Sequence, residues 1–171
     1  MERVLIVVDM QVDFVSGALG TKEAEAIVSR VAEKVRTFEG RVIFTRDTHT
    51  EAYPDTQEGR CLPVAHCVRG TEGWQLVPDL RGLAEGREVF DKPAFGSVAL
   101  ARALAAQAAS IGSIELIGLC TDICVVSNAL LLKAHFPEVP IRVDSSCCAG
   151  VTPEKHRAAL ETMASCQIEI L

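Results

Sequence analysis

Reactive side chains recur in this sequence directly after short apolar runs. Asp9, Asp47 and Lys92 each follow such a run, and Cys124 closes the turn Thr121–Cys124 after a fourth one. If the runs are parallel strands, their carboxyl ends meet at one edge of a sheet, where ligands bind in doubly wound α/β folds. Any one of these residues alone would be interpreted as a helix cap or a solvated loop residue. Their convergence at one edge is what indicates an active site.

Cys124, with Lys92 and Asp9, has the composition of a nucleophilic site. Cys124 is expected in the first turn of a helix, where unpaired backbone N–H groups and the helix dipole favour an anion. We therefore expect a lowered pKa for Cys124 and a thiolate nucleophile. Lys92 would stabilise the thiolate, and Asp9 would carry protons to and from a leaving group. The alternative is an unreactive core thiol, the commoner role of a buried cysteine.

A second set of residues has the donor atoms of a metal site. Asp47 and His49 are separated by one residue, so an extended chain sends both side chains in a similar direction. His66 follows in a later segment. One carboxylate and two imidazoles suit Zn, Fe or Mn, and ordinary surface histidines are the alternative. His135 and His156 lie on predicted helices, where we expect them to be solvated or capping.

The reactive residues are embedded in an alternation of strands and helices. Val4–Val8 is a continuous β-branched and aliphatic run, typical of a strand covered on both faces, and Thr21–Phe38 has apolar residues at helical spacing. Later strands are predicted at 41–46, 87–91, 113–118, 141–144 and 167–170, and later helices at 97–109, 122–135 and 153–165. Such alternation predicts an α/β fold with a parallel sheet between helical layers.

The segment from Asp47 to about Leu83 does not fit this alternation. It is rich in Gly, Pro, Thr, His and acidic residues. A segment this long without regular structure is usually functional in a compact domain. Its Trp74, Val77 and Leu80 predict that part of it packs against the core.

Length and composition limit the possible classes of protein. The 171 residues, 49% of them hydrophobic, suit a single domain over 1–171. The net charge of −6, with scattered basic residues, argues against a nucleic acid partner. The first apolar run is too short for a signal segment and no run is long enough to span a membrane, so we expect a cytoplasmic protein. The seven cysteines include no zinc-ribbon pair and are expected to be mostly buried, reduced thiols.

Five motifs in order resemble the isochorismatase-like cysteine hydrolases, and among them the nicotinamidases. The segment Asp9–Phe14 is similar to the family's D-x-Q-x-D-F, and Asp47–His49 to its metal D-x-H. Leu62–Thr71 is similar to the P-x-H-C segment, Lys92–Ser97 to the lysine segment, and Gly118–Val125 to the G-x-x-T-D-x-C-V nucleophile turn. The resemblance covers essentially the whole chain.

The resemblance implies a three-layer α/β/α sandwich with a six-stranded, mainly parallel doubly wound sheet. It makes Asp9, Lys92 and Cys124 the catalytic triad. It places the oxyanion hole at the backbone N–H groups of Cys120 and Cys124, with a cis peptide between Leu119 and Cys120.

By the same resemblance, Asp47, His49 and His66 bind a divalent metal, with Zn first and Fe or Mn as alternatives. Glu58 is the candidate for a further ligand, and Asp55 is the second choice. Phe14 is a candidate wall of the substrate pocket, whereas Phe95 and Trp74 are equally compatible with core packing. Family members commonly form dimers or tetramers, so a homo-oligomer is expected.

The implied activity is hydrolysis of a small carboxamide, nicotinamide to nicotinate and ammonia, through a thioester on Cys124. Other substrates within the family stay open: an N-carbamoyl or ureido amide, or an isochorismate-type ether. An inactive member retained for binding or assembly is a further alternative. A dinucleotide-binding module lacks support, because no GxGxxG turn follows the first strand.

Overall fold

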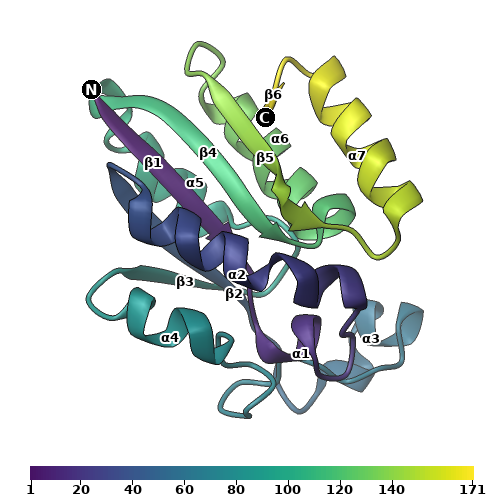
Figure 1. Cartoon of the computed structure of the whole chain (residues 1–171). Helices are drawn as coiled ribbons and strands as arrows, with labels where there is room; N and C mark the ends of the chain where they lie inside the picture. The colour runs from purple at the N-terminus through teal and green to yellow at the C-terminus, as the bar shows by residue number, and fades with distance from the viewer.

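The computed structural model describes all 171 residues as a six-stranded sheet with helices on both faces (Figure 1). The strands lie in the order β3-β2-β1-β4-β5-β6, and every neighbouring pair is parallel. The predicted three-layer α/β/α fold with a doubly wound sheet is therefore confirmed. The chain winds outward in opposite directions from the central pair, β1 and β4, so the strand order reverses between them.

The strands are β1 (Glu2–Val8), β2 (Arg41–Asp47), β3 (Glu88–Lys92), β4 (Ile111–Leu119), β5 (Ile141–Ala149) and β6 (Glu169–Ile170). The α-helices are α1 (Val12–Val15), α2 (Lys22–Thr37), α3 (Gln57–Cys61), α4 (Pro78–Ala84), α5 (Val98–Ala105), α6 (Val126–His135) and α7 (Pro153–Ser165). The shorter helical segments are η1 (Tyr53–Asp55), η2 (Ala108–Ser110) and the π-helical turn η3 (Thr121–Val125).

The central strand β1 shows why the sheet is covered on both faces. Leu5 and Val7 point into one apolar cluster, and Val4, Ile6 and Val8 point into the other. Successive side chains of a strand alternate between faces, so an unbroken apolar run requires a helical layer on each side. Helices α1, α2 and α4 contribute to the first cluster, and α5, α6 and α7 to the second.

Several predicted element boundaries were wrong. The segment 47–83 is not irregular throughout, because it contains η1, α3 and α4. The four residues of α1 were also not predicted. These helices are shorter than the window in which apolar periodicity can be recognised.

Other boundaries moved by several residues. The helix predicted over 97–109 ends at Ala105, and the one predicted over 122–135 begins as the turn η3. Strand β5 extends five residues beyond its predicted end at Asp144 and reaches Ala149. Its last residues, Cys147 to Ala149, are buried, and Cys148 and Ala149 pair with the end of β4.

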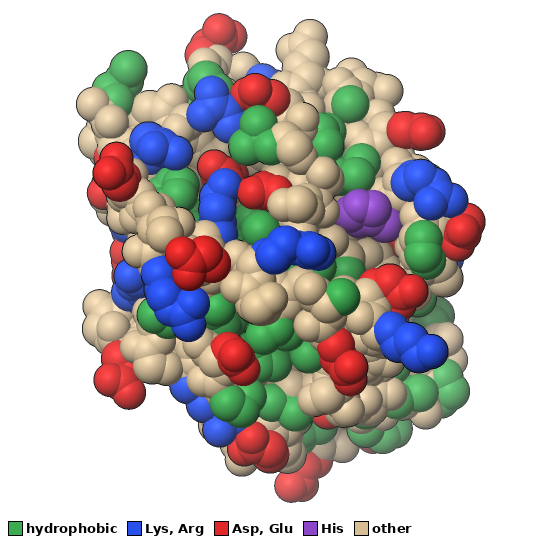
Figure 2. All heavy atoms as spheres, viewed as in Figure 1, with side chains coloured by type: hydrophobic (Ala, Val, Ile, Leu, Met, Phe, Trp, Pro, Cys, Tyr) green, Lys and Arg blue, Asp and Glu red, His purple; other side chains and the backbone are tan.

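The face of the molecule in Figure 2 is not strongly basic, because its Lys and Arg side chains are interspersed with Asp and Glu. No helix of the chain combines the length and the apolar character that crossing a membrane requires.

Candidate active site

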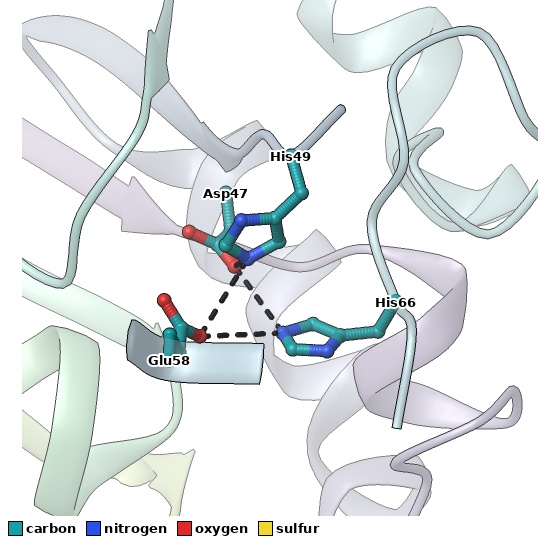
Figure 3. Close-up of side chains that lie close together, drawn as sticks. All are labelled: Asp47, His49, Glu58 and His66. Carbon is teal, nitrogen blue, oxygen red and sulfur yellow. Dashed lines mark hydrogen bonds and ion pairs between the residues drawn. The ribbon is translucent and has the colours of Figure 1, made fainter. Parts of the chain in front are cut away.

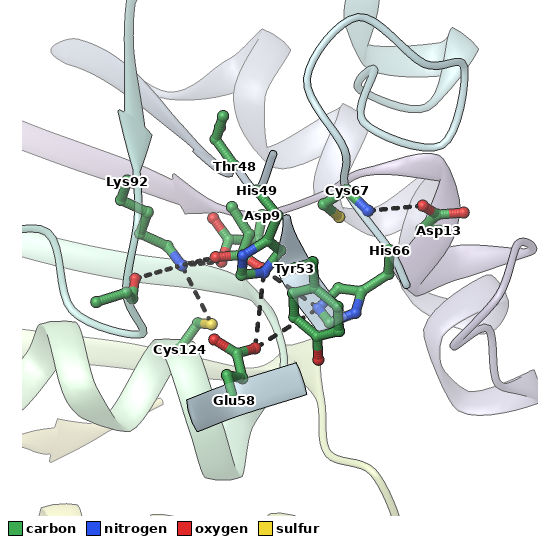
Figure 4. Close-up of polar contacts among 12 residues, drawn as sticks. Asp9, Asp13, Thr48, His49, Tyr53, Glu58, His66, Cys67, Lys92 and Cys124 are labelled. Carbon is green, nitrogen blue, oxygen red and sulfur yellow. Dashed lines mark hydrogen bonds and ion pairs between the residues drawn. The ribbon is translucent and has the colours of Figure 1, made fainter. Parts of the chain in front are cut away.

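Lys92 lies at the centre of a group of buried polar side chains at the carboxyl ends of β1, β2 and β3 (Figure 4). Its Nζ is 2.6 Å from Oδ2 of Asp9 and 3.3 Å from Sγ of Cys124. It also donates to the backbone oxygen of Ala94 at 3.1 Å and lies 3.3 Å from Oδ1 of Asp47. Lys92 is 1% exposed and Cys124 4% exposed. The predicted triad residues are therefore in contact through the ammonium group.

Asp9 is held at the end of β1 by contacts with β2. Its Oδ1 accepts a hydrogen bond from the Thr45 hydroxyl at 2.6 Å, and its backbone N–H donates to the Thr45 carbonyl at 3.2 Å. The backbone of Asp9 has a φ of 48°. This left-handed conformation, which Asp tolerates better than most residues, turns the chain out of the strand. The carboxylate thus stays at the sheet edge while the chain continues to α1.

Cys124 is presented by the turn that follows β4. Gly118 has a φ of 114°, and a Cβ there would come within 2.1 Å of the Val8 carbonyl oxygen, so only glycine fits. The peptide between Leu119 and Cys120 is cis, as the resemblance implied. The backbone N–H of Cys120 has no hydrogen-bond acceptor within the protein. That N–H is thus available at the position expected for an oxyanion donor.

The prediction of a lowered pKa for Cys124 was wrong. Burial raises the pKa of the Cys124 thiol, the charge of Asp9 raises it further, and Lys92 only partly opposes them. Burial also raises the pKa of Asp9, against the attraction of Lys92. Burial of Lys92 acts to lower its pKa, but the charges of Asp9, Cys124 and Asp47 raise the pKa overall. The group therefore combines a permanent ammonium with a carboxyl and a thiol whose raised pKa values suit proton exchange between them.

Asp47, His49, Glu58 and His66 form a second group (Figure 3), which lies directly beside the first (Figure 4). Their donor atoms all lie within 4.8 Å of one another. His49 Nε2 is 2.9 Å from Asp47 Oδ2 and 3.6 Å from Glu58 Oε1. His66 Nε2 is 3.5 Å and 3.7 Å from the same two oxygens. Two imidazoles and two carboxylates converging in this way fit a divalent cation such as zinc.

Glu58, the first choice for the additional ligand, joins this group, and Asp55 does not. Asp55 is exposed at the end of η1, whereas Glu58 lies on the next short helix, α3, whose N-cap is Thr56. The Thr56 hydroxyl accepts a hydrogen bond from the Gly59 N–H at 2.9 Å. Helix α3 thereby orients Glu58 toward the histidines.

Several positioning residues were not recognised from the sequence. The buried side chain of Gln11 accepts from the Asp47 N–H at 2.7 Å and donates to the Asp47 carbonyl at 2.8 Å. His66 Nδ1 lies 2.8 Å from the Val64 carbonyl, which leaves Nε2 directed at the carboxylates. Tyr53 packs edge-on against His49, with 4.7 Å between ring centroids. The only signal for Gln11 was its place in the opening motif.

Two residues of uncertain role are now distinguished. Trp74 is 9% exposed and belongs to the core, whereas Phe95 is 45% exposed and lines the pocket described below.

His135 is exposed, as predicted for a solvated histidine. His156 is only partly exposed, and its Nδ1 lies 2.8 Å from the Thr121 hydroxyl, so it contacts the nucleophile turn rather than solvent alone.

A pocket of about 590 Å³, its open mouth included, lies above both groups. It reaches Cys124 on one side and Asp47, Glu58 and His66 on the other. The remaining walls are Phe14, Leu19, Cys61, Leu62, Phe95, Cys120 and Ile123. No lysine or arginine lines it, and its walls are mainly apolar. Phe14, the predicted wall residue, packs against His66 with 5.4 Å between ring centroids.

The family model described as "Isochorismatase domain" matches residues 3–171. The chain belongs to the isochorismatase family. It is thus an isochorismatase-family hydrolase, and all five predicted motifs lie within the matched region.

Three solved structures resemble this isochorismatase-family chain over nearly its whole length. The pyrazinamidase of Pyrococcus horikoshii in complex with zinc is 31% identical, with a TM-score of 0.85, covering 100% of this chain and 99% of that chain. Nicotinamidase/pyrazinamidase PncA from Bacillus subtilis is 27% identical, with a TM-score of 0.82, covering 99% of each chain. N-carbamoylsarcosine amidase from Thermoplasma acidophilum is 28% identical, with a TM-score of 0.77, covering 99% of this chain and 95% of that one.

Proposed function

We propose that this chain is an amidohydrolase that converts a small heteroaromatic carboxamide, nicotinamide first among them, into the carboxylate and ammonia. The observation that carries the proposal is the pocket, which joins a buried cysteine to a cluster of metal-binding side chains between apolar and aromatic walls. A flat, uncharged ring fits such walls. The similarity to a zinc-bound pyrazinamidase and to a nicotinamidase/pyrazinamidase supports this choice.

The proposed reaction begins with proton transfer from the Cys124 thiol to the Asp9 carboxylate. The sulfur then attacks the carboxamide carbon, while the Lys92 ammonium, 3.3 Å from the sulfur, stabilises the developing thiolate. The backbone N–H groups of Cys120 and Cys124 hold the tetrahedral oxyanion. Removing one such donor typically raises the barrier by about 3 kcal/mol.

In the rest of the proposed cycle, Asp9 acts first as an acid and then as a base. It returns the proton to the departing nitrogen, so that ammonia leaves and a thioester remains on Cys124. It then takes a proton from water as the water attacks the thioester, which releases the carboxylate and restores the thiol. The pKa of Asp9 is raised toward neutral pH, which suits a group that must both accept and donate a proton.

A divalent metal held by Asp47, His49, Glu58 and His66 would supply a Lewis-acidic position for a ring nitrogen of the substrate. The four side chains fit such an ion by number and donor type. Without these four side chains, the pocket would offer an aromatic ring little besides apolar contact. The four proposed metal ligands therefore favour a heteroaromatic amide over an aliphatic one.

An amidase for N-carbamoyl acids is the second candidate, favoured by the similarity to N-carbamoylsarcosine amidase. Such substrates, like isochorismate, carry a carboxylate. The pocket walls offer no Lys or Arg to receive one. Burial of an unpaired carboxylate between mainly apolar walls is costly. The charge of the walls therefore favours a neutral substrate.

Ammonia release from nicotinamide, pyrazinamide and N-carbamoylsarcosine tests the proposal directly. We expect turnover of the two ring amides, loss of that turnover after treatment with a chelator, and recovery on addition of Zn²⁺. The Cys124→Ala variant should lose activity by a factor on the order of 10⁶. Turnover of N-carbamoylsarcosine without turnover of either ring amide would reject the proposed substrate class and retain the cysteine mechanism.

A further inference from the structure

Asn128 is a buried polar side chain that the proposed chemistry does not use. It lies on α6, four residues after Cys124, and is 1% exposed. Its Nδ2 donates to the Cys124 carbonyl at 2.8 Å and to the Phe95 carbonyl at 3.1 Å. Its Oδ1 accepts from the Ser97 N–H at 2.8 Å. A buried amide with three partners on two different segments fixes those segments relative to each other.

The two segments are those that carry Lys92 and Cys124. Phe95 and Ser97 belong to the loop 93–97, which directly follows Lys92 and precedes α5. The same loop holds the lysine, because Lys92 Nζ donates to the Ala94 carbonyl at 3.1 Å. Asn128 thus connects the helix after the nucleophile to the loop that orients the ammonium.

The sheet itself does not fix this distance. Lys92 ends β3 and Cys124 follows β4, and these strands are separated by β2 and β1 in the sheet. No ladder of strand hydrogen bonds therefore joins the two segments. Their approach depends on how the loop 93–97 packs on α6. At Gly96 a Cβ would lie 3.5 Å from the Ser127 carbonyl oxygen, which shows how closely the loop approaches the helix.

We infer that Asn128 is a positioning residue that sets the distance between the Lys92 ammonium and the Cys124 sulfur. It does so by tying the loop 93–97 to the first turn of α6. This inference rests on the proposed function for its effect on turnover, but not for its effect on the reactivity of Cys124. Because Lys92 stabilises the thiolate only at close range, displacement of the loop lowers that reactivity.

The test uses Asn128→Ala, Asn128→Gln and the control Ser127→Ala in the full chain. Ser127 is the neighbouring residue of α6 and is only partly buried. Two experiments are made on each variant. Peptide mass spectrometry follows the rate at which iodoacetamide alkylates Cys124, and a steady-state assay gives kcat and KM for nicotinamide. Circular dichroism at the assay temperature establishes that each variant is folded.

We expect Asn128→Ala to slow alkylation of Cys124 at least fivefold and to lower kcat by about 10- to 100-fold, since a misplacement of about 1 Å can cost 10²-fold. KM should change less than threefold. Asn128→Gln keeps the amide with one extra methylene and should give intermediate values, and Ser127→Ala should match the wild type. If Asn128→Ala does not fold, Asn128→Gln takes its place in the test.

Alkylation and kcat within twofold of the wild type in folded Asn128→Ala would overturn the inference. If Asn128→Ala does not fold, Asn128→Gln with kcat equal to that of the wild type would overturn it. A uniform loss of folded protein with unchanged alkylation of the folded fraction would do the same, because it would indicate a role in stability only. If the wild type does not hydrolyse nicotinamide but the order of alkylation rates holds, the proposed substrate fails and the positioning role stands.

Discussion

Asp47 joins the two polar groups of the site through its two carboxylate oxygens. Oδ1 lies 3.3 Å from the Lys92 ammonium, and Oδ2 lies 2.9 Å from His49. Although burial acts to raise the pKa of Asp47, its bonds to the histidines and the charge of Lys92 lower it well below the usual range. Asp47 therefore remains ionised, whereas Asp9, with a raised pKa, can take up a proton. The two carboxylates differ in role because their neighbours differ.

This difference predicts the effect of Asp9→Asn. The amide has nearly the same shape but cannot accept the thiol proton, so kcat should fall by about 10²- to 10⁴-fold. Ammonia release from nicotinamide measures the loss, and zinc content measures whether the neighbouring site is kept. Asp79→Asn, an exposed carboxylate on α4, serves as the control and should match the wild type. Full activity of Asp9→Asn would remove Asp9 from the proposed mechanism.

At the scale of elements, α2 is docked on the sheet by a partly buried ion cluster. Lys34 Nζ lies 2.6 Å from Glu115 on β4 and 3.0 Å from Asp144 on β5. Burial disfavours the charged form of Lys34, but its bonds to both acids raise its pKa overall. Burial likewise opposes ionisation of Asp144, but hydrogen bonds from Ser146 and Lys34 lower its pKa overall. Lys34 and Asp144 are therefore both charged around neutral pH.

We expect Lys34→Met to lower the free energy of unfolding by about 1–3 kcal/mol at pH 7, because it leaves the buried Glu115 and the partly buried Asp144 without their cation. Urea denaturation measures the change. Lys22→Met, on the same helix but exposed and without an ion pair, should change stability by less than about 0.5 kcal/mol.

The pH dependence of this difference follows from the two pKa shifts. The contribution of Asp144 is present above the ordinary pKa of an aspartate, about 4, and is lost as pH falls through its lowered value. The contribution of Lys34 is present below the ordinary pKa of a lysine, about 10.4, and is lost as pH rises through its raised value. The wild type and Lys34→Met should therefore converge in strongly acidic solution. A difference that stays constant from pH 7 to pH 2 would contradict this account.

At the scale of the whole molecule, the four proposed metal ligands come from three separate segments. Asp47 and His49 lie at the end of β2, Glu58 lies on α3, and His66 lies in the segment between α3 and α4. The donor set exists only when these segments are packed together. A ligand that binds only the folded state stabilises it by mass action.

Zinc at about 100 times its dissociation constant should therefore stabilise the protein by about 2.7 kcal/mol. For a chain of this size that corresponds to a rise in Tm of about 5–10 °C, measured by calorimetry after removal and readdition of metal. His66→Ala should abolish the rise, whereas His135→Ala, an exposed histidine on α6, should keep it. An equal rise in His66→Ala would place the zinc elsewhere in the molecule.

The sequence by itself determined the layers of the fold and the residue types of the candidate site. An unbroken apolar run such as Val4–Val8 requires cover on both faces, and that requirement is local to the strand. Because the carboxyl ends of parallel strands share one edge, Asp9, Asp47 and Lys92 were expected together before any distance was known. Glu58 and Asp55 could only be ranked, since both precede His66 in a segment without periodicity.

Only the tertiary structure decided properties that depend on burial or on contacts between distant segments. The position of Cys124 in a turn predicted a lowered pKa, but burial and the neighbouring charge of Asp9 raise it. The choice of Glu58 over Asp55 follows from the orientation of α3, and the contacts of Asn128 follow from the packing of a loop on α6. Desolvation and close-range electrostatics depend on which atoms the whole chain brings together, and no local pattern of residues records them.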